Sequence, residues 1–163
     1  MSIVSRVERT AKIMKTAEKM ITGRFGIKKQ CVEFSRRWLH LHRGMVYDDV
    51  KIAAEIWDKI HYYTDTSGQQ KYPVINIENG VSALPVPGDL LIYGAEFLGT
   101  GHVSVIVNVE KSSGFICVHE QNYANKYQAP YQQRCISFVN KNNRNWLQDE
   151  YVLGWKSLQK VKV

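Results

Sequence analysis

Apolar residues recur at helical spacing in three stretches of the first sixty residues. The first stretch predicts an amphipathic helix over residues 3–22, and the second predicts a helix that begins near Gln30 and ends at Gly44 as a left-handed cap. The third follows two aspartates that can cap a helix and predicts one over residues 49–62. The apolar positions are Val4, Val7, Ala11, Met14, Ala17 and Ile21, then Val32, Phe34, Trp38 and Leu41, then Val50, Ala53, Ala54, Ile56, Trp57 and Ile60.

After residue 70 the pattern changes to short apolar and β-branched runs separated by turn residues. Two of these runs flank Lys111–Gly114 and predict an antiparallel hairpin. Helices followed by a run of strands indicate an α+β fold, with N-terminal helices packed on a central antiparallel β-sheet. The extended runs are residues 72–77, 90–93, 102–109, 115–122, 134–139 and 151–155.

The composition is typical of one globular domain that buries a sizeable core. The chain has 163 residues, 44% of them hydrophobic, and only three cysteines. Cys31, Cys117 and Cys135 show neither a disulfide framework nor a metal spacing, so we expect Cys117 and Cys135 to be buried free thiols in a reducing compartment. With no secretory signal pattern and no run of about 18 apolar residues, the sequence predicts a cytoplasmic protein without a transmembrane segment, and delivery by a secretion system or by lysis is the alternative.

The net charge of +7 is concentrated in residues 1–30, which carry eight basic residues against two acidic ones. This predicts a basic helical lead-in over residues 1–25, ahead of a domain over residues 26–163. Its basic face could make weak contact with an anionic surface, or it could simply be solvated while the apolar stripe packs on the domain. We expect no nucleic-acid partner, and the oligomeric state stays open.

Cys31 stands in the first turn of the predicted helix over residues 30–43. Unpaired backbone N–H groups and the positive end of the helix dipole favour a thiolate there, which is the reactive form of cysteine. The alternative is a small buried hydrophobe, because a lone cysteine needs a base before it can act as a nucleophile.

The predicted hairpin supplies that base. Side chains alternate faces along a strand, and cross-strand partners share a face, so His102, Glu120 and Asn122 should lie together at one end of the hairpin. Cys31 as nucleophile, His102 as base, and Glu120 or Asn122 to orient the imidazole match the arrangement of a papain-like thiol hydrolase. The other histidines show no ligand spacing, so we expect no metal site.

These blocks resemble the CHAP amidases, and most of all the amidase domain of glutathionylspermidine synthetase/amidase and the related trypanothione enzymes. The resemblance covers residues 26–157 and departs at residues 1–25, at an absent ligase domain, and in the loop between Asn122 and Arg134. The blocks that carry it are Gln30–Leu39, Gly88–Ile92, Thr100–Val103, Glu120–Asn122 and Leu153–Trp155.

The resemblance implies a cofactor-free thiol amidase that cleaves the glycine–spermidine amide of glutathionylspermidine. Cys31, His102 and Glu120 would then be the catalytic residues, and Glu120 is preferred over Asn122 as the third member. The N–H of Cys31 and the side chain of Gln30 would stabilise the oxyanion, and Asn122 would support the site or bind substrate. Arg36 matches a position that contacts the glutathione carboxylates, although a solvated surface arginine is the alternative.

Two other functions stay open. The same residues could hydrolyse an amide in a cell-wall peptide, and the net basic charge favours such an anionic polymer over a polycationic leaving group. The domain could also bind a ligand without turnover. The joint presence of cysteine, histidine and glutamate argues against that last function.

Overall fold

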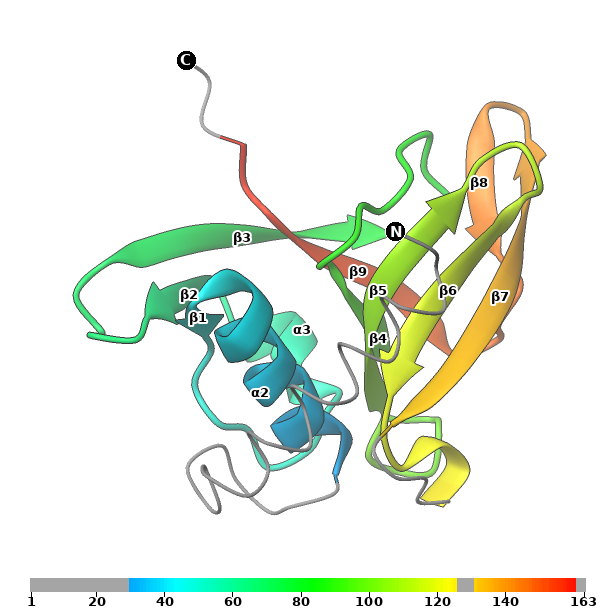
Figure 1. The fold of residues 1–163 in the computed structure, drawn as a ribbon. Helices are drawn as coiled ribbons and strands as arrows, with labels where there is room; N and C mark the ends of the chain where they lie inside the picture. Colours follow the sequence, from blue (N-terminus) through cyan, green and yellow to red (C-terminus); the bar gives the residue numbers. More distant parts are fainter. Residues whose placement is uncertain (1–29, 126–130, 161–163) are drawn as a thin grey trace.

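The computed structural model describes residues 30–125 and 131–160, so the predicted basic helix over residues 3–22 lies outside the described residues. Two α-helices, a single 3-10 turn and nine strands make up the described part (Figure 1). They are α2 (Cys31–Arg43), β1 (Met45–Val46), α3 (Glu55–Lys59), β2 (Tyr62–Asp65), β3 (Lys71–Glu78), β4 (Leu90–Tyr93), β5 (His102–Glu110), β6 (Phe115–Glu120), η1 (Tyr123–Asn125), β7 (Gln132–Lys141), β8 (Arg144–Leu147) and β9 (Val152–Leu158).

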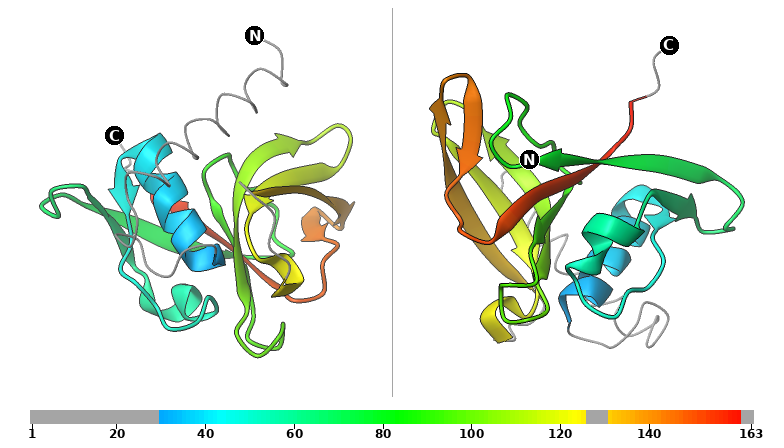
Figure 2. Two further views of the ribbon diagram at one scale, coloured as in Figure 1. Left: turned by 60° about the horizontal axis from the view of Figure 1, so that its bottom comes forward. Right: turned by 180° about the vertical axis from the view of Figure 1, so that it is seen from behind.

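All nine strands belong to one antiparallel sheet in the order β1-β2-β3-β9-β4-β5-β6-β7-β8. Strand β9 joins its two halves, because it pairs with β3 on one side and with β4 on the other. Figures 1 and 2 show α2 and α3 beside the β1–β3 half, while β4–β8 curve away into a second half that carries only the short 3-10 helix η1. The predicted α+β fold with helices packed on an antiparallel sheet is confirmed.

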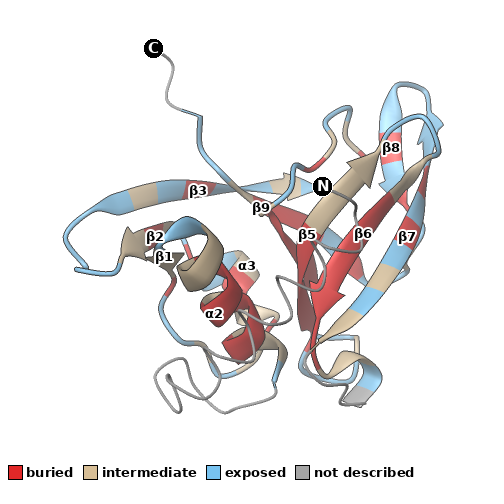
Figure 3. Ribbon diagram, in the orientation of Figure 1, coloured by how far each residue is buried: buried red, intermediate tan, exposed pale blue. Residues whose placement is uncertain are grey.

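The strands in the middle of the sheet are buried on both faces, as Figure 3 shows for β5 and β6. Alternate residues of β4 and β5 pack into two separate hydrophobic cores, one on each face of the sheet. Ile92 and Val105 pack toward the helices with Phe34, whereas Leu91 and Ile106 pack inside the curved half. The central strands therefore read as continuous apolar runs, in which period-two alternation cannot be seen.

Helix α2 confirms the second predicted helix and its glycine cap, because Gly44 has a left-handed φ of 65° and donates its N–H to His40 O. On this helix Glu33 and Arg37 are both buried and are joined by an ion pair of 2.8 Å between Arg37 Nε and Glu33 Oε1. Each charge neutralises the other, which is what allows both to be buried on a helix next to a core.

The third predicted helix is much shorter than expected. Only Glu55–Lys59 is helical, and the chain then leaves Ile60 to form β2 against β3. Residues 51–54 form bends and a turn, held in part by the hydrogen bond of 3.1 Å from Ala54 N to Thr100 O. Pairing of β2 with β3 and the hydrogen bond to the distant Thr100 overrode the local helical spacing, and the sequence pattern also missed β1, β2 and β8.

Two glycines of the sequence blocks are required by close backbone approach. Gly101, with a φ of 71°, lies where a Cβ would collide with the carbonyl of Tyr93 and with Ala54. Gly154 on β9 lies against the carbonyl of Ile77 on β3, so a side chain there would separate two paired strands. Gly101 precedes β5 directly, so its conformation sets the point at which His102 enters the sheet.

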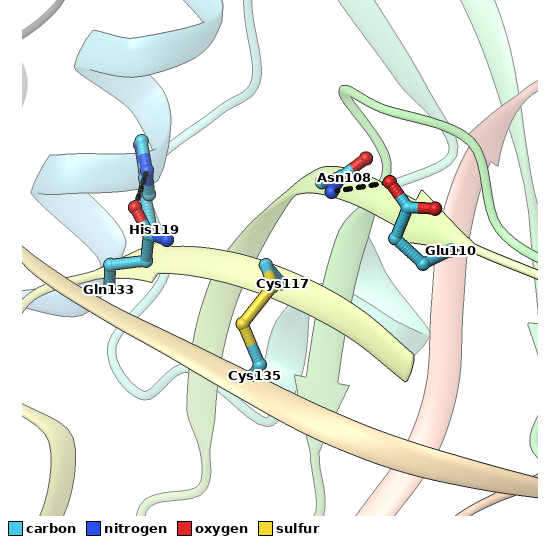
Figure 4. Close-up of a disulfide and its surroundings, with 6 residues drawn as sticks. All are labelled: Asn108, Glu110, Cys117, His119, Gln133 and Cys135. Atoms are coloured by element: carbon cyan, nitrogen blue, oxygen red, sulfur yellow. Dashed lines mark hydrogen bonds between the residues drawn. A yellow bond between two sulfur atoms is a disulfide. The ribbon is translucent and has the colours of Figure 1, made fainter. Parts of the chain in front are cut away.

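The expectation that Cys117 and Cys135 are free thiols is wrong. They occupy directly opposite positions on β6 and β7 and form a disulfide (Figure 4). Cys117 on β6 is buried, but Cys135 on β7 is exposed. The spacing of 18 residues carries no disulfide signal by itself, because only the strand register brings the two cysteines together. The inference of a reducing compartment loses its premise.

This disulfide should stabilise the curved half of the sheet. In the chain-entropy account, a loop of this length contributes about 3 kcal/mol, so replacing Cys135 by serine should lower the free energy of unfolding by about 2–3 kcal/mol without reductant. Urea unfolding of wild type and Cys135→Ser, with and without dithiothreitol, measures this. The difference should vanish in the reductant, and equal stability in its absence would contradict the prediction.

Candidate active site

Cys31 is the first residue of α2, and Gln30 is the cap residue in extended conformation with φ −105°. The backbone N–H groups of a first turn have no carbonyl partners within the helix, so they point at whatever lies beyond its end. The sulfur receives backbone hydrogen bonds from Val32 and from Val103 of β5, and a side-chain hydrogen bond joins it to His102. The only described cysteine outside the disulfide therefore lies partly exposed at the junction of helix and sheet.

His102 and Glu120 come from neighbouring strands. β5 pairs with β6 so that Val105 lies opposite His119. In the same register, the next pair toward the strand ends is Ser104 and Glu120. His102 Nε2 lies 2.9 Å from Glu120 Oε2, and both side chains are almost fully buried. A bulge shifts the register between Ile106 and Asn108. It lies toward the turn of the hairpin, so it does not change the pairing next to His102 and Glu120.

The Glu120 carboxylate has three donors. His102 and the Ser104 hydroxyl bind Oε2, and Arg134 Nε donates to Oε1 at 2.7 Å. Because the Glu120 carboxylate is 0% exposed, its charge is stable only if these donors replace water.

The pKa values define a charged site. Burial opposes a charged Glu120, but the hydrogen bonds and charges of His102 and Arg134 outweigh it and lower the pKa of Glu120 to about 2. Burial likewise opposes the imidazolium, but Cys31 and Glu120 raise the pKa of His102 to about 9. For Cys31, burial favours the thiol, yet the interaction with His102 leaves its pKa below the ordinary value. These shifts favour a thiolate–imidazolium pair beside an ionised carboxylate.

The ionised carboxylate also fixes the ring's orientation. An ionised Glu120 can only accept, so His102 Nε2 carries a proton and Nδ1 is the nitrogen that faces Cys31. Aromatic rings surround the imidazole on its other sides: Tyr93 and Tyr123 both lie edge-on with centroids 5.4 Å away, and Phe97 lies at 6.2 Å. These rings limit rotation of the imidazole and keep water from the His102–Glu120 bond.

The remaining predicted site residues are placed less directly. Gln30 is exposed beside Cys31 and makes no side-chain capping bond. Asn122 follows β6 with a left-handed φ of 59°, half-buried beyond Glu120. Arg36 lies a turn further along α2, where its Nε donates to Tyr47 O at 2.9 Å and its Nη1 lies 3.9 Å from Asp49. Arg36 is therefore not a freely solvated arginine.

Sequence reasoning missed the residues behind Glu120. Ser104 could have been found, because it lies two positions after His102 on a strand and so shares its face. Arg134, Tyr93 and Asp149 had no local signal, since they come from β7, β4 and the segment between β8 and β9. Among residues 30–125 and 131–160, no His, Cys, Asp and Glu side chains group as a metal site.

A cysteine at a helix N-terminus, facing a His–Glu pair on an antiparallel sheet, defines a papain-like cysteine hydrolase. A family model described as CHAP domain matches residues 22–122, more than half of the chain. The chain belongs to the CHAP domain family and is a hydrolase that acts on amide bonds.

Three known proteins are similar to this chain. Trypanothione synthetase of Crithidia fasciculata is 40% identical over 108 residues, 65% of this chain and 16% of that protein. The bifunctional glutathionylspermidine synthetase/amidase of Escherichia coli (strain K12) is 35% identical over 138 residues, 80% of this chain and 22% of that protein. The crystal structure of the wild-type endolysin LysIME-EF1 matches with a TM-score of 0.50 and 14% identity, covering 89% of this chain and 63% of that one.

The chain thus spans about a fifth of the length of the curated relatives. The endolysin likeness shows a shared fold and nothing about substrate. In the part of the chain that the structure describes, no helix is long and apolar enough to cross a membrane.

Proposed function

We propose that this chain is a thiol amidase that hydrolyses glutathionylspermidine, or a related glutathionyl-polyamine conjugate, into glutathione and the free polyamine. The observation that carries the substrate class is the 35% identity to glutathionylspermidine synthetase/amidase across 80% of the chain. The arrangement of Cys31, His102 and Glu120 supports the chemistry, because the hydrogen bond to His102 lowers the pKa of the Cys31 thiol, and Cys31 and Glu120 raise the pKa of His102 to about 9.

In the acylation step, the Cys31 sulfur attacks the amide carbonyl and forms a tetrahedral intermediate. The N–H of Cys31, unpaired within the helix, and the exposed side chain of Gln30 are the proposed donors to the oxyanion. His102 then gives its Nδ1 proton to the leaving nitrogen, the C–N bond breaks, and the polyamine departs as a free amine. Glu120 stabilises the imidazolium and stays ionised throughout.

In the deacylation step, water attacks the thioester. His102, now neutral, takes a proton from the water through Nδ1 and returns it to the departing sulfur, or retains it beside the regenerated thiolate. The acyl group leaves as a carboxylic acid, and the thiolate–imidazolium pair is restored. These steps use only the residues of this chain and water, so we expect turnover without an added cofactor.

Arg36 is the proposed contact for a carboxylate of the acyl group. Its Nη1 lies 3.9 Å from a carboxylate oxygen of the exposed Asp49. A substrate carboxylate could take the place of Asp49 without breaking the bond from Arg36 Nε to Tyr47 O. Asn122, half-buried beyond Glu120, is the proposed polar contact on the sheet side of the site.

A second candidate substrate is an amide in a cell-wall peptide. The observation that favours it is the Cys117–Cys135 disulfide with its exposed Cys135, because disulfides persist mainly outside reducing compartments. The net charge of +7 would also favour an anionic polymer.

Released amine distinguishes the two substrates. Wild-type protein is incubated with glutathionylspermidine and, separately, with defined muropeptides, and Cys31→Ala is the matched blank in both arms. We expect glutathionylspermidine to be cleaved. Cleavage of muropeptides alone would transfer the assignment to the cell wall, and cleavage of neither substrate would refute both.

A further inference from the structure

Arg134 on β7 is the residue that links the site to the rest of the curved half of the sheet. Its Nε donates to Glu120 Oε1 at 2.7 Å, and its Nη2 lies 3.4 Å from Glu120 Oε2. The guanidinium therefore binds both carboxylate oxygens, which fixes the plane of the carboxylate as well as its position. One of these oxygens is the one that His102 binds.

The guanidinium is itself held in place by further groups. Its Nη1 donates to Asp149 Oδ2 at 3.0 Å, and its Nη2 donates to the Tyr93 hydroxyl. Tyr93 in turn donates to Asp149 at 2.7 Å, and the Tyr123 ring lies 3.9 Å from the guanidinium carbon. Arg134 is thus fixed on every side, with its side chain 20% exposed.

We propose that Arg134 is a positioning residue for the hydrolase reaction: its guanidinium holds the Glu120 carboxylate against the His102 ring, and Tyr93 and Asp149 hold the guanidinium. It does not touch the reacting atoms, because Glu120 and His102 lie between it and Cys31. Its effect on the sulfur passes through them. This inference rests on the proposed function where amide turnover is measured. The rate at which iodoacetamide labels Cys31 tests the role of Arg134 without any substrate.

The charges around Glu120 set the direction of the effect. The titratable and charged groups that face this site from the neighbouring elements are His102 of β5, Arg134 of β7, Tyr93 of β4, Tyr123 of η1 and Asp149 after β8. Of these, only His102 and Arg134 can bring positive charge to the carboxylate. Without Arg134, buried Glu120 would keep its proton to higher pH, and a neutral Glu120 no longer stabilises the imidazolium or, through it, the thiolate.

The test compares Arg134→Gln, Arg134→Lys and the distant control Arg144→Gln. For Arg134→Gln we expect kcat to fall about tenfold to a hundredfold with little change in KM, since a misplaced imidazole slows proton transfer without removing a substrate contact. The acid limb of the pH profile, both for kcat/KM and for iodoacetamide labelling of Cys31, should move up by about one pH unit.

Arg134→Lys should return the acid limb toward the wild-type position while recovering kcat only partly. A lysine restores the charge but cannot bind Glu120, Tyr93 and Asp149 together. Arg144→Gln should match wild type in every measurement. If Arg134→Gln loses only stability, with kcat and both acid limbs unmoved, Arg134 is structural and the proposal is wrong.

Tyr93→Phe covers the case in which Arg134→Gln fails to fold. It removes one hydroxyl from the tether, so a smaller shift of the acid limb in the same direction is expected, and an unmoved limb would overturn the proposal. Absence of amide turnover by the wild type would refute the proposed function alone, because the labelling profiles still report on Arg134.

Discussion

Replacing Cys31 by alanine is expected to abolish amide turnover, with a loss of at least about 10⁴-fold in kcat. The sulfur is hydrogen-bonded to His102, and its thiolate form is favoured by that ring. Initial rates of amine release with purified wild-type and variant protein measure the loss.

The fold should survive this substitution. Cys31 is only partly buried, and alanine removes a single sulfur, so the free energy of unfolding should change by no more than about 1 kcal/mol. A matched control is the double variant Cys117→Ala/Cys135→Ala, which removes the other two sulfurs and should keep turnover while losing stability. Residual turnover by Cys31→Ala above a tenth of the wild-type rate would exclude Cys31 as the nucleophile.

Replacing His102 by alanine is expected to lower turnover by about 10³–10⁴-fold, since the variant loses both the proton donor for the leaving amine and the base for water. Iodoacetamide labelling of Cys31 near pH 7 should also slow by about tenfold, because an ordinary cysteine is only a few per cent thiolate there. In the non-reduced protein Cys117 and Cys135 are joined to each other, so labelling reports on Cys31.

The pH dependence of wild-type turnover should also reflect the pairing of Cys31 with His102. The raised pKa of His102 means that its proton is held up to about pH 9 and lost above it, so turnover should decline as the pH rises through about 9. The acid limb should follow protonation of Cys31 below its ordinary range. His61→Ala, which removes an exposed histidine next to α3, should leave labelling and turnover unchanged. Equal labelling rates in His102→Ala and wild type would contradict the ion pair.

Local signals in the sequence were sufficient for the helix that carries Cys31 and for the hairpin that carries His102 and Glu120. Helical spacing and a following glycine determine α2, and the alternation of strand faces determines that His102 and Glu120 share a face. These relations extend over at most about 20 residues. The helix over residues 49–62 was predicted too long, because pairing of β2 with β3 and the hydrogen bond from Ala54 N to the distant Thr100 O compete with a weak local helical preference.

Only the tertiary structure decided which residues contact Glu120 and which cysteines pair. The Cys117–Cys135 disulfide requires the register between β6 and β7, which no local pattern encodes. Arg134 and Asp149 reach Glu120 from distant segments, and a lone arginine in a strand looks like a solvated one until its partners are known. The sequence alone predicted the candidate catalytic groups, because their chemistry depends on residue type and short spacing. The electrostatic environment that charges them depends on long-range packing, so it could be known only from the fold.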